Sequence, residues 1–345
     1  MPAAGKKWLW TAVAILVVWG LIGASQGKGG LPPIREGGTS DLVMYRAIAT
    51  RVAAGESYYP VLASELPARG YAIRPVFNWR LPTLVWLNAL PPAHLWGRIL
   101  LAGVGLLGIM VWLVTLHRTS PRAVPLAVPI LLLGTAPLLT MDASVDFYEV
   151  WAGLCVAASL AANGMGWWRT SVALGAGGLF IRELVLPYVL IMAAAAWIES
   201  RRREAVTWLA AVAAFMAFWA WHLSQVLGVM PEKGLENAWL VGGGWPFVLE
   251  ASHASIFLML FPERFEQYLV ALLVPLLWAG GWYWANGTGR RVAATLTTYF
   301  LCFMIAGRPD NWYWGFIVAP LIPLAGLGYL HGPRKSRRRR SAAPA

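Results

Sequence analysis

The chain has 345 residues, of which 58% are hydrophobic and only 13% are charged, and its formal net charge is +12. Soluble globular domains carry about 25% charged residues, so this composition, with several apolar runs of bilayer length, excludes an ordinary soluble domain. The positive charge does not indicate nucleic acid, because it gathers in short loops and in the tail "PRKSRRRRSAAPA", where it follows the positive-inside rule and meets anionic lipid. Only helices satisfy their own backbone in uniformly apolar runs. We therefore expect an all-α polytopic membrane protein, with a single transmembrane domain over 1–331 and a basic cytoplasmic tail over 332–345.

The apolar runs predict about ten membrane-spanning helices. They cover 8–24, 94–117, 124–140, 147–163, 170–181, 184–198, 205–227, 267–285, 292–307 and 312–331. The first run follows Lys6 and Lys7, and its tryptophans favour a retained signal-anchor over a cleaved signal peptide. Two of the runs are shorter than the ~20 residues of a full crossing, and the charged pair Arg182–Glu183 separates them.

The charges divide by membrane side. If both termini are cytoplasmic, the basic loops lie inside and nearly all carboxylates lie outside, with Glu199 and Glu204 as the clear exceptions. Two outer segments are long, 25–93 and 228–266, and their mixture of aromatic, glycine and charged residues predicts helices on the membrane surface. We expect an inner (plasma) membrane protein whose extracytoplasmic face is the working face.

The stretch "GGTSDLVMYRAIATRVAAGESYYP" at 37–60 opens the first outer segment. It predicts a helix over Leu42–Ala54, capped by Thr39 or Ser40 and ended by Gly55. The Asp41 carboxylate then sits beside the apolar stripe of that helix. A helix dipole explains an acidic first turn, whereas a carboxylate beside the membrane can also take a proton from an incoming hydroxyl.

This stretch, followed by "FNWRLP" at 77–82 and an apolar run, resembles the start of GT-C glycosyltransferases that use polyprenyl-phosphate sugars. Within that superfamily it is most similar to glycosyltransferase family 87, the mannosyltransferase-like proteins, with Asp41, Leu42, Tyr45 and Arg46 in register. The aromatic-Pro-Pro run of the family is replaced here by "FNWRLP". The resemblance covers 37–85 well and the rest of the chain only by span order and the "RE" of Arg182–Glu183.

The resemblance implies a GT-C-like fold and an inverting transfer of a sugar, mannose by analogy, from a polyprenyl-phosphate donor to a glycan or glycolipid acceptor. Asp41 would be the general base, and Tyr45 and Arg46 would contact substrate. Two other functions remain open: a transporter or flippase of lipid-linked saccharides, and a non-catalytic subunit that acts as a scaffold. No nucleotide-binding motif is found, which favours a lipid-carried donor.

A departing phosphate needs nearby cations. The expected donor-phosphate ligands are Arg182, Arg80 and Arg308, with Arg74 a weaker candidate. Arg182 and Glu183 can also form a plain salt bridge with each other, and Arg308 can be a helix-terminal anchor.

Further substrate contacts are expected from Glu183, His253 and Asp310. In "MDASVDFYEVW", Asp142, Asp146 and Glu149 stand at i, i+4 and i+7 and are predicted to lie on one face of the outer end of a span. That face could contact the acceptor sugar, hold Mg²⁺ or Mn²⁺, or form an acidic first turn. We expect no cofactor, with metal left open but not favoured.

Overall fold

The computed structural model describes residues 3–28, 41–140, 142–255, 263–284 and 286–330. The predicted caps Thr39 and Ser40 and the basic tail lie outside these ranges. Within them the chain is all-helical, as predicted, and its only strand-like pairing is an isolated bridge between Arg74 and Glu236.

The longer helices follow the predicted apolar runs. Their bounds are α1 Ala3–Ser25, α5 Leu95–Thr119, α6 Val124–Thr140, α7 Tyr148–Gly164, α8 Trp168–Ile181, α9 Leu186–Ile198, α10 Arg202–Val229, α12 Glu263–Tyr283 and α13 Gly287–Ala306. The shorter elements are α2 Asp41–Ala53, α3 Tyr58–Ala68, η1 Val76–Asn78, α4 Thr83–Ala89, η2 Pro121–Ala123, η3 Asp142–Asp146, η4 Glu183–Val185, α11 Gly244–Ser252, η6 Pro309–Ile317, α14 Leu321–Gly326 and η7 Leu327–Leu330.

The predicted count of about ten spans is not confirmed. Among the described residues, four helices are long and apolar enough to cross a membrane, namely α1, α5, the α6 segment and α10. The bent pair Asp310–Ile317 and Leu321–Leu330, with 51° between its parts, makes a fifth if it counts as one span. The other predicted spans are helical but fall short in length or apolar character. Several helices can therefore span a membrane, and the remainder pack between them.

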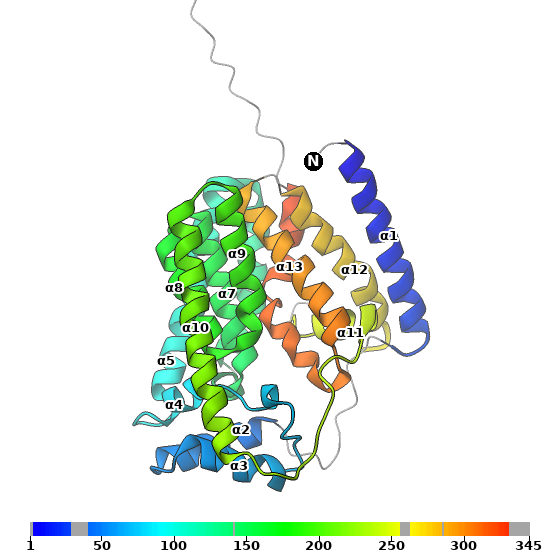
Figure 1. The fold of residues 1–345 in the computed structure, drawn as a ribbon. Coiled ribbons are helices and arrows are strands. Elements are labelled where there is room, and N and C mark those ends of the chain that lie inside the picture. The colour runs from blue at the N-terminus through cyan, green and yellow to red at the C-terminus, as the bar shows by residue number, and fades with distance from the viewer. Residues whose placement is uncertain (1–2, 29–40, 141, 256–262, 285, 331–345) are drawn as a thin grey trace, which may run out of the picture.

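The short helices α2, α3 and α4 gather at one end of the bundle (Figure 1). They lie at the end where α5 and α12 begin and α10 ends. This is the end predicted to face outward, and α2 runs over nearly the range predicted for it. Its last turn gives way to Gly55 at φ 97°, a left-handed conformation that glycine adopts without strain.

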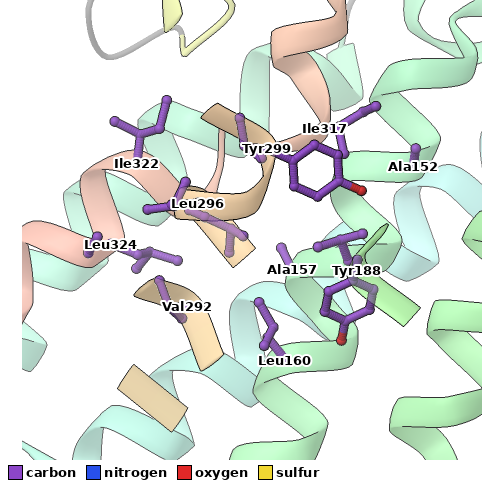
Figure 2. Packing of buried hydrophobic residues seen from close by; sticks show 14 of the residues in the cluster. Ala152, Ala157, Leu160, Tyr188, Val292, Leu296, Tyr299, Ile317, Ile322 and Leu324 are labelled. Atoms are coloured by element: carbon purple, nitrogen blue, oxygen red, sulfur yellow. The ribbon is translucent and has the colours of Figure 1, made fainter. Parts of the chain in front are cut away.

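The core lies around α7, which is buried on nearly all sides. Its small residues let neighbouring elements approach closely: a Cβ on Gly153 would lie 2.0 Å from the carbonyl oxygen of Phe316. Figure 2 shows Ala152, Ala157 and Leu160 of α7 among apolar side chains of α9, α13 and the η6–α14 segment. A helix apolar on every face is the one that a bundle buries completely.

The opposite end of the bundle carries partly buried ion pairs. Glu199 accepts from Arg291 at 2.6 Å and pairs with Arg201 at 2.9 Å. The Asn163 amide donates to Glu204 at 2.8 Å. Glu199 and Glu204, the two carboxylates predicted at the inner side, therefore neutralise arginines at the starts of α10 and α13.

Helix α1 packs along α12. Leu9 and Val13 form an apolar cluster with Ala279, and the Trp10 indole donates a 2.7 Å hydrogen bond to the Tyr283 hydroxyl. A Cβ on Gly20 would lie 2.9 Å from that of Ala271, which sets the close approach of the two helices.

Candidate functional site

Asp41 is the first residue of α2, at the bundle end that carries the short helices. Its Oδ1 accepts a 2.7 Å hydrogen bond from the Tyr71 hydroxyl, and the side chain is half-buried. The first turn of a helix stabilises a negative charge. The hydrogen bond from Tyr71 fixes the orientation of the carboxylate.

Arg80 is the central cation of the site. Its guanidinium is nine-tenths buried and donates to the hydroxyl of Tyr45 at 3.0 Å, to that of Tyr313 at 3.4 Å and to the Phe77 carbonyl at 3.5 Å. Among the described residues, no carboxylate lies within salt-bridge distance of it. A buried cation that has only neutral hydrogen-bond partners strongly favours the binding of an anion.

Tyr45 and Tyr313 interact with both charged groups of the site. Both phenols interact electrostatically with the Asp41 carboxylate and with the Arg80 guanidinium. Burial raises the pKa of Tyr45 above its ordinary value, and Arg80 opposes that rise, so this phenol stays neutral at physiological pH. The site thus holds a carboxylate and a cation that both interact with two neutral phenols.

The backbone around Arg80 is held from two helices. The Tyr58 hydroxyl of α3 donates to the Arg80 carbonyl at 2.6 Å. His222 of α10 lies between the Trp79 carbonyl, 3.2 Å from its Nε2, and the Tyr59 hydroxyl, 3.0 Å from its Nδ1. Since a carbonyl only accepts, Nε2 carries the proton in this hydrogen bond. These contacts anchor the loop that presents the guanidinium.

Arg182 forms a buried ionic cluster next to this group. Its Nε donates to Glu149 at 2.8 Å and its Nη1 to Glu183, and both Arg182 and Glu149 are fully buried. Glu149 and Glu183 also interact at longer range with Arg80. The salt bridge between Arg182 and Glu183, one of the alternatives predicted for this pair, is therefore present, and Glu149 from α7 forms a second ion pair with Arg182. Because two carboxylates already neutralise Arg182, Arg80 is the better placed cation for a substrate phosphate.

The predicted acidic face of "MDASVDFYEVW" is wrong. Asp142 and Asp146 lie in η3, and the helix breaks at Phe147 before Glu149 begins the first turn of α7. The break turns Glu149 towards Arg182. No face of three carboxylates forms, because the segment is not one continuous helix.

Asp142 and Asp146 instead bind Arg46. The guanidinium donates to Asp146 at 2.9 Å and to Asp142 at 3.0 Å. Asp146 also accepts from the Asn88 amide at 3.2 Å and lies 3.4 Å from His94, while Arg98 pairs with Asp142. Arg46, predicted to contact substrate, therefore clamps α2 onto η3, α4 and α5.

Arg308 and Asp310 lie on η6 and its entry. They form an exposed pair at 3.4 Å. One turn on, the Asn311 amide oxygen accepts from Tyr313, the residue that contacts Arg80. Asp310 also interacts with Glu250 of α11, which is buried and whose Oε1 has no hydrogen-bond partner in the described structure.

His253 ends α11 and is fully buried. Its Nδ1 lies 2.9 Å from the Leu249 carbonyl and its Nε2 lies 3.2 Å from Glu266. Burial lowers the pKa of His253, and Glu266 opposes that shift. Within the described ranges, no hydrogen bond or ion pair joins this histidine to Asp41 or Arg80.

Sequence reasoning missed three residues of this region, Tyr71, Tyr313 and Glu250. Tyr71 lies 30 residues from Asp41, and Tyr313 lies 233 residues from Arg80. No local spacing marks such pairs. Tyr71 lies in the outer segment 25–93 and Tyr313 near the start of the predicted span 312–331, where tyrosines are expected as interfacial residues.

A metal has no evident ligand set here: among the described residues, no group of three or more His, Cys, Asp or Glu side chains is arranged to hold an ion. The comparisons with known proteins give no guidance, since no family model, no curated protein and no solved structure matches the chain.

Proposed function

We propose that the chain is an integral membrane glycosyltransferase of the GT-C type. It moves a sugar, mannose by family analogy, from a polyprenyl-phosphate donor to an acceptor hydroxyl with inversion at the anomeric carbon. The reaction takes place at the outer face of the inner (plasma) membrane. The acceptor is a glycan or a glycolipid.

One observation carries the proposal: Arg80 donates to the hydroxyls of Tyr45 and Tyr313, and both tyrosines also interact electrostatically with Asp41, at the bundle end that holds the surface helices. A glycosyl transfer needs a base for the acceptor and a cation for the leaving phosphate, on opposite sides of the sugar. The carboxylate and the guanidinium supply both within one neighbourhood.

The chemistry assigns a role to each group. The acceptor oxygen attacks the anomeric carbon as its proton passes to Asp41, and the bond from that carbon to the phosphate oxygen breaks. Polyprenyl phosphate leaves with the bonding electrons, and Arg80 stabilises the charge on its oxygens. Tyr71 orients Asp41, while Tyr45 and Tyr313 hold Arg80 and can donate to the substrate.

The test is sugar transfer from a labelled polyprenyl-phosphate donor in membranes that contain each variant. Asp41→Asn is expected to lower kcat by about 10²–10⁴-fold with little change in donor KM, because it removes only the base. Arg80→Lys is expected to raise the donor KM about tenfold or more, since a lysine cannot form the forked hydrogen bonds of arginine. Arg51→Lys, on the same surface helix but in an exposed ion pair, serves as the control.

Retained transfer by Asp41→Asn would rule out that residue as the base. The runner-up, a flippase of lipid-linked saccharides, makes a different prediction: the wild type would translocate labelled lipid across vesicles without transferring its sugar.

A further inference from the structure

A shallow groove lies between α1 and the end of α12, at the bundle end opposite the proposed active site. It is open to the surroundings, has a volume of about 710 Å³ and is lined by Lys6, Lys7, Trp10, Thr11, Ala14 and Tyr283. Figure 1 places the start of α1 beside the end of α12 and away from α2 and α3.

The groove combines free positive charge with an aromatic wall. Lys6 Nζ lies 5.4 Å from the centre of the Tyr283 ring, and the Trp10 indole donates to the hydroxyl of the same tyrosine. Both lysines are exposed, and within the described ranges neither pairs with a carboxylate. Their charge is therefore available to an anion.

The level of the groove along α1 indicates where that anion sits. On the side towards the middle of the helix, Ile15, Val18 and Ile22 are 59%, 56% and 52% exposed, as side chains that face lipid tails are. Trp8 is 76% exposed at the groove's own level, which is typical of an interfacial aromatic belt. The lysines thus stand at headgroup depth, directly above an apolar face.

We propose that this groove binds the phosphate of an anionic phospholipid. Lys6 and Lys7 contact the phosphate, the Trp10–Tyr283 pair lines the headgroup, and the acyl chains continue past Ala14 along the exposed face of α1. Charge complementarity favours an anionic lipid over a neutral one, because each lysine near a membrane surface adds ~1 kcal/mol of attraction. The bound lipid would add to the direct packing of α1 on α12, which includes the cluster of Leu9, Val13 and Ala279.

The experiment is native mass spectrometry of the full chain released from detergent, with phosphatidylglycerol and phosphatidylcholine offered in competition. The wild type is expected to retain one phosphatidylglycerol in preference to phosphatidylcholine. Lys6→Gln combined with Lys7→Gln should weaken that binding by about 10–30-fold. Ala14→Trp, which fills the groove but keeps both lysines, should weaken it as well and remains informative if the double variant fails to insert.

Two controls separate this site from general surface charge. Lys28→Gln lies at the other end of α1, and Arg202→Gln with Arg203→Gln removes two charges elsewhere in the predicted inner loops. Both should retain the lipid. Equal binding of the two lipids by the wild type, or equal loss in the Arg202 and Arg203 variant, would overturn the proposal.

Discussion

Arg80 and Arg182 are both buried arginines, but they differ in what neutralises their charge. Arg182 has two carboxylates in contact, whereas Arg80 has two phenols and a carbonyl. Breaking a buried ion pair costs about 3–5 kcal/mol, so Arg182 is held in place while Arg80 can take up an anion without losing a salt bridge. At the residue scale this difference selects the cation for the donor phosphate.

Glu250 gives a pH prediction at the same scale. Burial raises the pKa of Glu250 to about 7, and the neighbouring Asp310 carboxylate adds to the rise. The unfolded chain loses this proton at the ordinary carboxyl pKa, so between that value and about pH 7 the folded state binds more protons than the unfolded state. The Glu250 contribution to stability is therefore full at low pH and is lost as pH rises through 7.

Glu250→Gln should remove that dependence. We expect the melting temperature of the variant to exceed that of the wild type at pH 8 by roughly 2–5 °C and to match it near pH 5. Thermal melts of both proteins in one detergent, over a series of buffers, measure the difference. A constant offset at every pH would contradict the assignment.

At the scale of elements, the Arg46 clamp explains how an amphipathic surface helix keeps its place. Helix α2 buries the face that carries Met44, Tyr45, Ile48 and Ala49. On its exposed face, Arg46 forms ion pairs with the two aspartates of η3. The apolar face sets which side faces the bundle, and the ion pairs set the register. Tyr45 and Asp41 depend on that register for their positions beside Arg80 and Tyr71.

The two acids of the clamp should differ in their contributions. Asp146 is buried, with a side chain only 2% exposed, whereas that of Asp142 is 62% exposed. Asp146→Ala is expected to destabilise the α2 region by about 1–3 kcal/mol, because it removes the buried acceptor shared by the Asn88 amide and the Nε of Arg46. Asp142→Ala should cost less than ~1 kcal/mol, as exposed pairs do.

Hydrogen exchange of the α2 backbone measures both effects. Faster exchange should appear in the Asp146 variant and not in the Asp142 variant. Equal exchange in the two variants would show that the clamp does not hold the helix.

At the scale of the whole molecule, the charged groups gather at opposite ends of one bundle. Asp41, Arg46 and Arg80 lie with the short helices, while the Glu199–Arg291 pair and the lysines of α1 lie at the other end. The helices between them carry apolar faces. The arrangement fits a membrane between the two ends, with the basic end inside under our proposal.

Cysteine labelling tests that orientation. In a Cys302→Ser background, Thr50→Cys on the exposed face of α2 should react with a membrane-impermeant maleimide in intact cells. Arg203→Cys, at the other end of α10, should react only after permeabilisation. The reverse pattern would invert the proposed topology and place Asp41 in the cytoplasm.

The sequence by itself determined the helical class, the position of the main helices and the helix that begins at Asp41. Apolar run length and local capping signals act within one segment, so they can be read along the chain. Only the tertiary structure decided how many helices are long enough to span, that Asp142 and Asp146 bind Arg46, and that Arg80 faces Tyr313. These results depend on helix breaks and on contacts between residues far apart in the chain, which no local period encodes. The residue types of a segment give its charge, but the tertiary packing determines which residue neutralises that charge.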